Sequence, residues 1–181
     1  MSRTALIQVL GAVAYGEHKA HEEARANAAR ATDTDQQRAW RVIAAEELRH
    51  YKGFVRRLRA LDADPERAMR PYRASLDRFH GFDSDGDEIV ESVCSLLGEG
   101  IASDLLVWLR TVVDTDTAAF IDTVIADEVN HEGRAIDQVR RLLHAHSDGK
   151  HRAARGAARM LGMMLASAPG SGPAFVAFAR V

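Results

Sequence analysis

Apolar residues recur every three or four positions along five long stretches of the chain, which is the period of an amphipathic helix. The pattern predicts helices over about 4–31, from a cap at 32–35 to about 61, over about 87–113, from a cap at 114–116 to about 147, and over about 150–168. Ser, Thr and Asp side chains at helix starts accept hydrogen bonds from the first free backbone N–H groups, so segments 32–35 and 114–116 are expected to cap the second and fourth helices.

Residues 62–87, between the second and third helices, are too long and too interrupted by Pro71, Gly81 and Gly86 for a tight antiparallel loop. They predict a crossover that carries a short connecting helix after Pro65. The expected fold is therefore all-α: a single domain over 1–181, built as a ferritin-like antiparallel four-helix bundle over about 4–146 with one long crossover. A short fifth helix follows, and after the breaker cluster 168–173 the residues 174–181 would form a helix stub or a packing arm.

Glutamates interrupt the apolar stripes at matching places in the two halves of the chain. Glu17 lies on the first stripe and Glu99 on the third, and the second and fourth stripes each carry Glu-x-x-His, as Glu47 with His50 and Glu128 with His131. The offsets agree, since 99 minus 17 is 82, and both 128 minus 47 and 131 minus 50 are 81. One Glu-x-x-His on a helix is commonly a solvated pair, but a repeated pattern of six donors favours a metal site.

Four inward carboxylates would each cost on the order of several kcal/mol unless they were paired. The stripes carry no Lys or Arg to pair with them, and two divalent cations would balance four negative charges. Ligands that are mostly carboxylate with one imidazole per ion suit iron or manganese better than zinc. The sequence therefore predicts a dinuclear site, with two iron ions as the first choice and manganese as the alternative.

Five further residues are candidates for supporting roles. Glu46 and Asp127 precede the motif glutamates and lie about 100° round the helix from them, which suggests outer carboxylates. Tyr15 and Tyr51 flank ligands and could be redox-active, hydrogen-bond donors or plain core residues. His21, one turn after Glu17, could be an extra ligand or an outer group.

Composition narrows the class of protein. The 181 residues are 46% hydrophobic with a net charge of -2, which argues neither for nor against a polyanionic partner. Cys94 is the only cysteine, so no intrachain disulfide is expected, and the first residues lack the apolar core of a secretion signal. No stretch approaches the roughly 18 uncharged apolar residues that span a bilayer, and 160–168 comes nearest. We expect a cytoplasmic protein that does not enter a membrane.

The six donors resemble the ligand set of the ferritin-like superfamily, a Glu from each of two helices and Glu-x-x-His from each of two others. More narrowly, residues 14–17, 45–50, 64–72, 76–80 and 98–102 look like actinobacterial proteins grouped with the MiaE-like tRNA hydroxylases. The resemblance implies a non-haem diiron oxygenase that activates O2. It implies an organic substrate and an electron-donor protein as partners. It also implies that Glu99 or Glu128 changes its coordination to open a site on the metal, which is called a carboxylate shift. It also implies that Asp127 orients His50 and Glu46 orients His131.

The resemblance does not carry over the substrate. A modified tRNA nucleoside is one candidate, and the arginines of the crossover and of the fifth helix are either solvated or contacts for such an anion. The alternatives are a ferroxidase or bacterioferritin-like store, a rubrerythrin-type peroxidase, a manganese catalase, and a helical metal-binding module without oxygen chemistry. A homodimer is the expected assembly.

Overall fold

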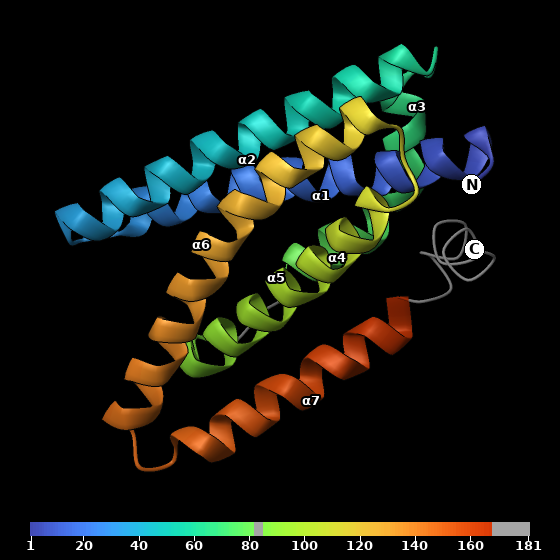
Figure 1. The fold of residues 1–181 in the computed structure, drawn as a ribbon. Coiled ribbons are helices and arrows are strands. Elements are labelled where there is room, and N and C mark those ends of the chain that lie inside the picture. The colour runs from blue at the N-terminus through green and yellow to red at the C-terminus, as the bar shows by residue number, and fades with distance from the viewer. Residues whose placement is uncertain (82–84, 168–181) are drawn as a thin grey trace. The chain divides into compact units, whose positions relative to one another are not determined.

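The computed structural model describes residues 1–81 and 85–167, which contain helices and no strand (Figure 1). The helices are α1 Arg3–Arg30, α2 Thr34–Ala60, α3 Pro65–Met69, the 3-10 helix η1 Arg70–Tyr72, α4 Arg73–His80, α5 Glu88–Arg110, α6 Thr115–Ala145 and α7 Gly149–Ser167. They fall into two compact units, which we call the N-terminal unit (1–81) and the C-terminal unit (85–167). The all-α class expected from the sequence is confirmed.

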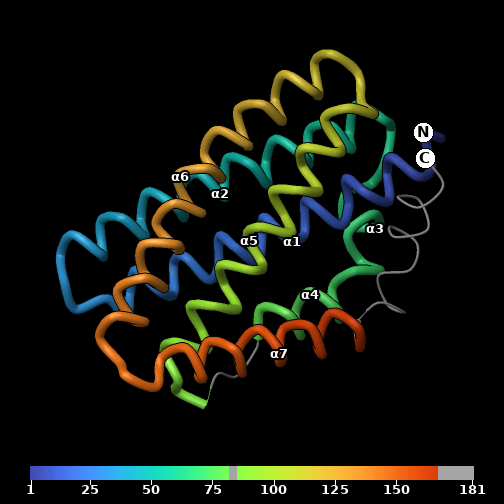
Figure 2. The backbone as a smooth tube through the Cα atoms, turned by 60° about the horizontal axis from the view of Figure 1, so that its bottom comes forward, coloured from blue at the N-terminus to red at the C-terminus, as the bar shows by residue number. Residues whose placement is uncertain are grey.

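The N-terminal unit is a hairpin of α1 and α2 with the crossover helices packed on it (Figures 1 and 2). Ser2 caps α1 through its hydroxyl, and Asp33 caps α2 by accepting from the backbone N–H of Gln36 at 3.0 Å. The two helices bury apolar side chains against each other, including Leu10, Ala14, Phe54 and Leu58. The short 31–33 connection is what makes α1 and α2 antiparallel neighbours.

The crossover lies against α1 at two points. Asp64 caps α3, whose first residue is Pro65, and a Cβ added at Gly11 of α1 would collide with the carbonyl oxygen of Ala68. Only a residue without a side chain allows this close backbone approach. Farther along, α4 buries only Ser75 and is held to α1 by polar contacts. The main one is a 2.6 Å hydrogen bond that the Tyr15 hydroxyl donates to Asp77.

The C-terminal unit consists of α5, α6 and α7, with Ile89, Val93 and Leu142 in its core. Asp114 caps α6 by accepting from the N–H of Thr117 at 2.9 Å. The unit places α7 along α5, where Gly156 packs so closely against Val90 and Val93 that a Cβ would be tightly fitted.

Asp87 holds the start of α5 and the start of α7 together. Its carboxylate accepts from the N–H groups of Ile89 and Val90, and also from the guanidinium groups of Arg152 and Arg155 at 2.8 and 2.9 Å. The Arg152 hydrogen bonds hold the pKa of Asp87 far below its ordinary value. These arginines, for which the sequence left open solvation or an anionic partner, are therefore engaged within the unit.

The predicted helix ends agree with the observed ones to within about three residues, and the crossover contains α3, η1 and α4 where one short helix was expected. The predicted arm at 174–181 lies outside the described residues. The expectation that 160–168 comes nearest to a membrane span was wrong. The most apolar helix is α5, with a mean hydropathy of 1.4 over 18 residues. By length and composition alone, α5 is long and apolar enough to cross a membrane. Core helices of globular proteins meet the same criterion. An uncharged apolar stretch was not found in α5 because Glu91, Glu99 and Asp104 interrupt its apolar residues.

The contact between Gly11 and Ala68 predicts a steric effect of substitution. Gly11→Ala should lower the free energy of unfolding by about 1–3 kcal/mol, because the new methyl group has to displace backbone rather than a mobile side chain. Gly133→Ala is the matched control in α6, where a Cβ meets nothing, and it should raise stability by up to about 1 kcal/mol through helix propensity. Urea unfolding measures both, and equal effects would contradict the packing described here.

Candidate metal centre

Three of the predicted ligands come together in the N-terminal unit. Glu17 on α1 and Glu47 and His50 on α2 are 8%, 5% and 1% exposed, and their ligand atoms lie within 4.8 Å of one another. His50 Nδ1 lies 3.3 Å from Glu17 Oε2 and 3.5 Å from Glu47 Oε2. Two carboxylates and one imidazole form a donor set of the kind that binds a divalent metal ion. This group could hold a metal.

The cause of this convergence is local. Glu47 and His50 are three residues apart on α2, so both project from one face of the helix. The hairpin turns that face towards the stripe of α1 that carries Glu17.

Burial sets the electrostatics of the group. It raises the pKa of the Glu17 carboxyl well above the usual range, and the hydrogen bond from His50 offsets part of this rise while the nearby Glu47 charge adds to it. A buried pair of carboxylates beside a single imidazole has no full compensation for its charge. A bound cation would supply that compensation, so the residues present fit a metal ion.

The C-terminal unit repeats part of this layout. Glu128 and His131 on α6 are buried, and His131 Nδ1 lies 3.6 Å from Glu128 Oε2. Glu99 on α5 is less buried than these two. Five of the six predicted motif residues are therefore buried, and Glu99 is the least enclosed.

Glu46, Asp127 and His21 are three of the residues that the sequence suggested for supporting roles. Glu46 and Asp127 are both half-buried beside their motif glutamates, and their pairing with His131 and His50 stays a prediction. His21 is close to the backbone of α2, with Nδ1 2.6 Å from the Ala44 carbonyl oxygen.

The two tyrosines contact residues outside the predicted ligand set. Tyr15 is buried and points to the crossover, where burial and the bond to Asp77 raise its pKa to about 12. Tyr51 packs on His18 of α1, with ring centroids 5.1 Å apart. His18 also lies 6.1 Å from the Tyr15 ring, so the three rings form a row along the hairpin.

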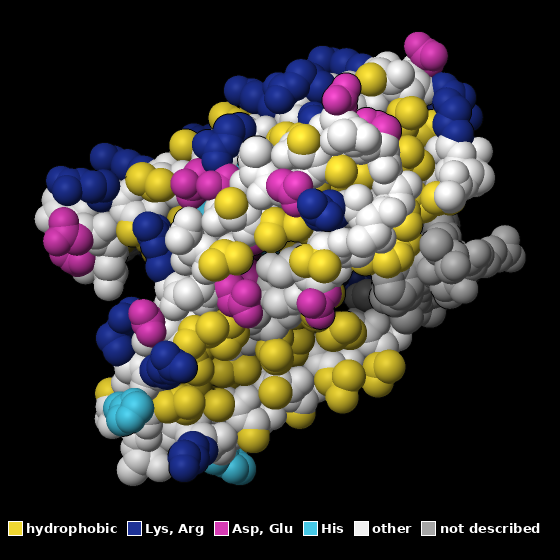
Figure 3. Space-filling model, viewed as in Figure 1, with side chains coloured by type: hydrophobic (Ala, Val, Ile, Leu, Met, Phe, Trp, Pro, Cys, Tyr) yellow, Lys and Arg dark blue, Asp and Glu magenta, His cyan; other side chains and the backbone are white. Residues whose placement is uncertain are grey.

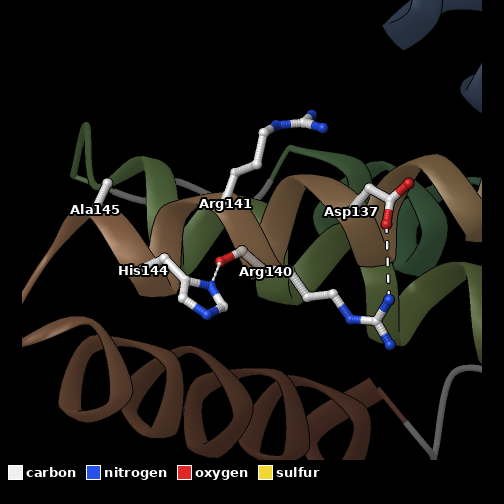
Figure 4. A pocket seen from close by; sticks show the side chains of 5 residues that line it. All are labelled: Asp137, Arg140, Arg141, His144 and Ala145. Carbon is white, nitrogen blue, oxygen red and sulfur yellow. Dashed lines mark hydrogen bonds and ion pairs between the residues drawn. The ribbon is translucent and has the colours of Figure 1, made fainter.

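A cavity of about 500 Å³ opens at the far end of α6, and no predicted ligand lines it (Figure 4). Its lining residues are Asp137, Arg140, Arg141, His144 and Ala145. Arg140 and His144 project towards α7, and Arg141 projects the other way. Arg140 pairs with Asp137 at 3.7 Å, while Arg141 bonds the neutral Gln138. The lining of the cavity therefore carries two guanidinium groups and one carboxylate.

Sequence reasoning missed two contacts that shape these surroundings. The Tyr15–Asp77 bond joins residues 62 positions apart, and the Arg152–Asp87 pairs join residues 65 apart. Tyr15 is buried, so its hydroxyl needs a partner, but nothing in the sequence pattern identified Asp77 as that partner.

A helical protein with buried Glu and His donors is a candidate metal-binding protein. A family model described as "Ferritin-like domain, actinomycetes" matches residues 2–170. The chain belongs to this ferritin-like family. No curated protein matches the chain.

The raised pKa of Glu17 predicts a pH effect on the metal-free protein. The contribution of Glu17 to stability is fully present below its ordinary pKa of 4.5 and is lost as the pH rises towards the raised folded value. Glu17→Gln should flatten this part of the plot of melting temperature against pH. Glu91→Gln, at an exposed site on α5, is the control and should leave the slope unchanged. Identical slopes for the parent and Glu17→Gln would show that Glu17 is not buried as described.

Proposed function

We propose that the chain is a non-haem diiron protein that uses O2 to oxidise an organic substrate. The observation that carries the proposal is the buried group of Glu17, Glu47 and His50, together with the same Glu-x-x-His layout at Glu128 and His131. Membership of a ferritin-like family supports it. We propose further that the two helical hairpins pair as a four-helix bundle, with Glu99 completing six ligands for two ions.

The chemistry divides between the metal and the chain. Bound iron would supply the redox steps that no side chain of this set can perform. Glu17, Glu47 and Glu128 would supply negative charge, and His50 and His131 one neutral donor each. Burial keeps water from these side chains, and the i, i+3 spacing fixes their orientation before the metal binds.

The substrate and partners are further proposals. The MiaE-like resemblance suggests a modified tRNA nucleoside, and the guanidinium groups of Arg140 and Arg141 at the end of α6 would suit an anion of that kind. We also propose that an electron-donor protein reduces the iron and that the protein acts in the cytoplasm. Manganese in place of iron would use the same donors.

Anaerobic iron loading followed by metal analysis tests the proposal. About two irons per chain are expected, with one or none in Glu47→Ala and Glu128→Ala, because each variant removes a charged donor. Glu91→Ala is the control for the loss of an exposed carboxylate. Less than one iron per chain, unchanged by Glu47→Ala, would refute the metal site.

Oxygen uptake by the reduced, iron-loaded protein then separates the activities. An oxygenase should consume O2 in proportion to its bound iron and to added substrate and reductant. Continued oxidation of many added ferrous ions per chain would assign a ferroxidase instead. Bound metal without O2 uptake would leave a metal-binding module.

A further inference from the structure

Exposed basic side chains follow one edge of α2 along most of its length, and Figure 3 shows Lys and Arg gathered along this helix. At 100° per residue they fall within an arc of about 80°, and they extend over about 32 Å. We call them the basic stripe, and its members are Arg38, Arg41, Arg49, Lys52, Arg56 and Arg59.

The charge of the stripe is not balanced within its own helix. The sequence of α2 contains seven basic residues and three acidic ones, although the whole chain has a net charge of -2. Leaving Arg49 aside, no member of the stripe forms an ion pair with an acid among residues 1–81 and 85–167. Like charges three or four residues apart weaken a helix, and only Arg59, in the last turn, is favoured by the helix dipole. The stability of α2 therefore does not explain the stripe.

The stripe and the predicted ligands lie on opposite sides of the same helix. Glu47 and His50 are buried, and they are about 150° round α2 from the centre of the stripe. One helix with its side chains is about 10–12 Å across. A molecule that docks on the stripe is therefore separated from these ligands by the thickness of α2 alone.

This position suits a partner that delivers electrons rather than a substrate. A substrate has to reach the reacting atoms, and an RNA bound along the stripe would have α2 between its bases and the side chains of Glu47 and His50. An electron needs no such contact, because it crosses protein at a rate that falls steeply with distance. Attachment to a lipid surface draws on apolar insertion as well as charge, and Val42 is the one large apolar side chain exposed on α2, which is described throughout.

We propose that the basic stripe is the docking surface of an acidic protein that carries one electron at a time, of the ferredoxin or flavodoxin class. Opposite charge steers such a partner to the stripe, and redox encounters need only a small contact area. Each encounter oxidises the carrier by one electron, so two encounters supply the two electrons that reduce two ferric ions, and no proton or group is transferred. The inference rests on the diiron function proposed above and adds the surface at which the electron donor binds.

Binding of the full, metal-free chain to two acidic carriers, a [2Fe–2S] ferredoxin and a flavodoxin, tests the proposal without depending on the iron site. Surface plasmon resonance should detect binding to the immobilised carriers. The Kd should rise with added salt, because salt screens exposed charges. Absence of salt-sensitive binding to both carriers would overturn the proposal.

Reversal of three charges locates the contact. Arg41→Glu/Lys52→Glu/Arg59→Glu should raise the Kd roughly 10-fold or more, chiefly through slower association. Helical circular dichroism should be unchanged, because two of these substitutions place carboxylates three and four residues from Arg56. Gln at the same three positions should cause a smaller loss in the same direction.

The matched control makes the same change in net charge at three exposed sites outside α2, as Arg78→Glu/Arg134→Glu/Lys150→Glu. Its Kd should stay within about threefold of the parent value, because salt screens charges that lie outside the contact. An equal loss in both variants would show that net charge rather than the stripe governs binding, and it would overturn the proposal.

Reduction of the iron-loaded protein separates this inference from the proposed function. Reduced ferredoxin should reduce the parent roughly 10-fold faster than the charge-reversal variant, while dithionite, which needs no docking surface, should reduce both at the same rate. Equal rates with ferredoxin would overturn the docking surface and leave the iron site intact. Failure to load iron, with carrier binding that still depends on the stripe, would refute the diiron function and retain the docking surface.

Other anionic partners give different results. An RNA duplex that binds more tightly than both carriers, and no longer binds the charge-reversal variant, would assign the stripe to nucleic acid. Co-sedimentation with phosphatidylglycerol vesicles that is lost in the same variant, without carrier binding, would assign it to lipid. Either result would overturn the proposal.

Discussion

The burial of carboxylates within helices is the constraint on which the rest of this protein depends. A buried carboxylate without a compensating cation costs on the order of several kcal/mol, and Glu17 and Glu47 are buried side by side with a single imidazole between them. The raised pKa of Glu17 expresses this cost in the metal-free protein. A bound cation would neutralise the same two side chains, and metal binding at this site would then stabilise the hairpin that carries it.

In each unit, contacts outside the predicted ligand set hold the helices together. In the N-terminal unit, the crossover packs backbone to backbone at Gly11 and adds the Tyr15–Asp77 bond on the side of α1 away from the ligands. In the C-terminal unit, Asp87 both caps α5 and anchors α7 through Arg152. These contacts hold ligand-bearing helices in place with residues that would not bind the metal themselves.

Helical periodicity predicted the helices well because α1, α2, α5 and α6 each have an apolar stripe and a capping Ser or Asp at the start. The same periodicity identified Glu17, Glu47 and His50, since polar residues on an apolar stripe have to be inward. It could not give the paths of the crossover helices or the partner of Tyr15, which depend on contacts between residues far apart in sequence. It also treated Arg152 and Arg155 as solvated or anion-binding, because a charge pattern on one helix does not reveal an acid on another.

The central claim is that the repeated Glu and Glu-x-x-His donors bind two metal ions together. X-ray absorption spectroscopy of the iron-loaded protein tests this most directly, because the fine structure reports neighbouring iron atoms as well as light ligands. We predict a shell of oxygen and nitrogen donors and an iron–iron distance of about 3.5–4 Å, with the iron–iron feature absent in Glu128→Ala. A light-atom shell with no iron–iron feature in the fully loaded parent would contradict the account.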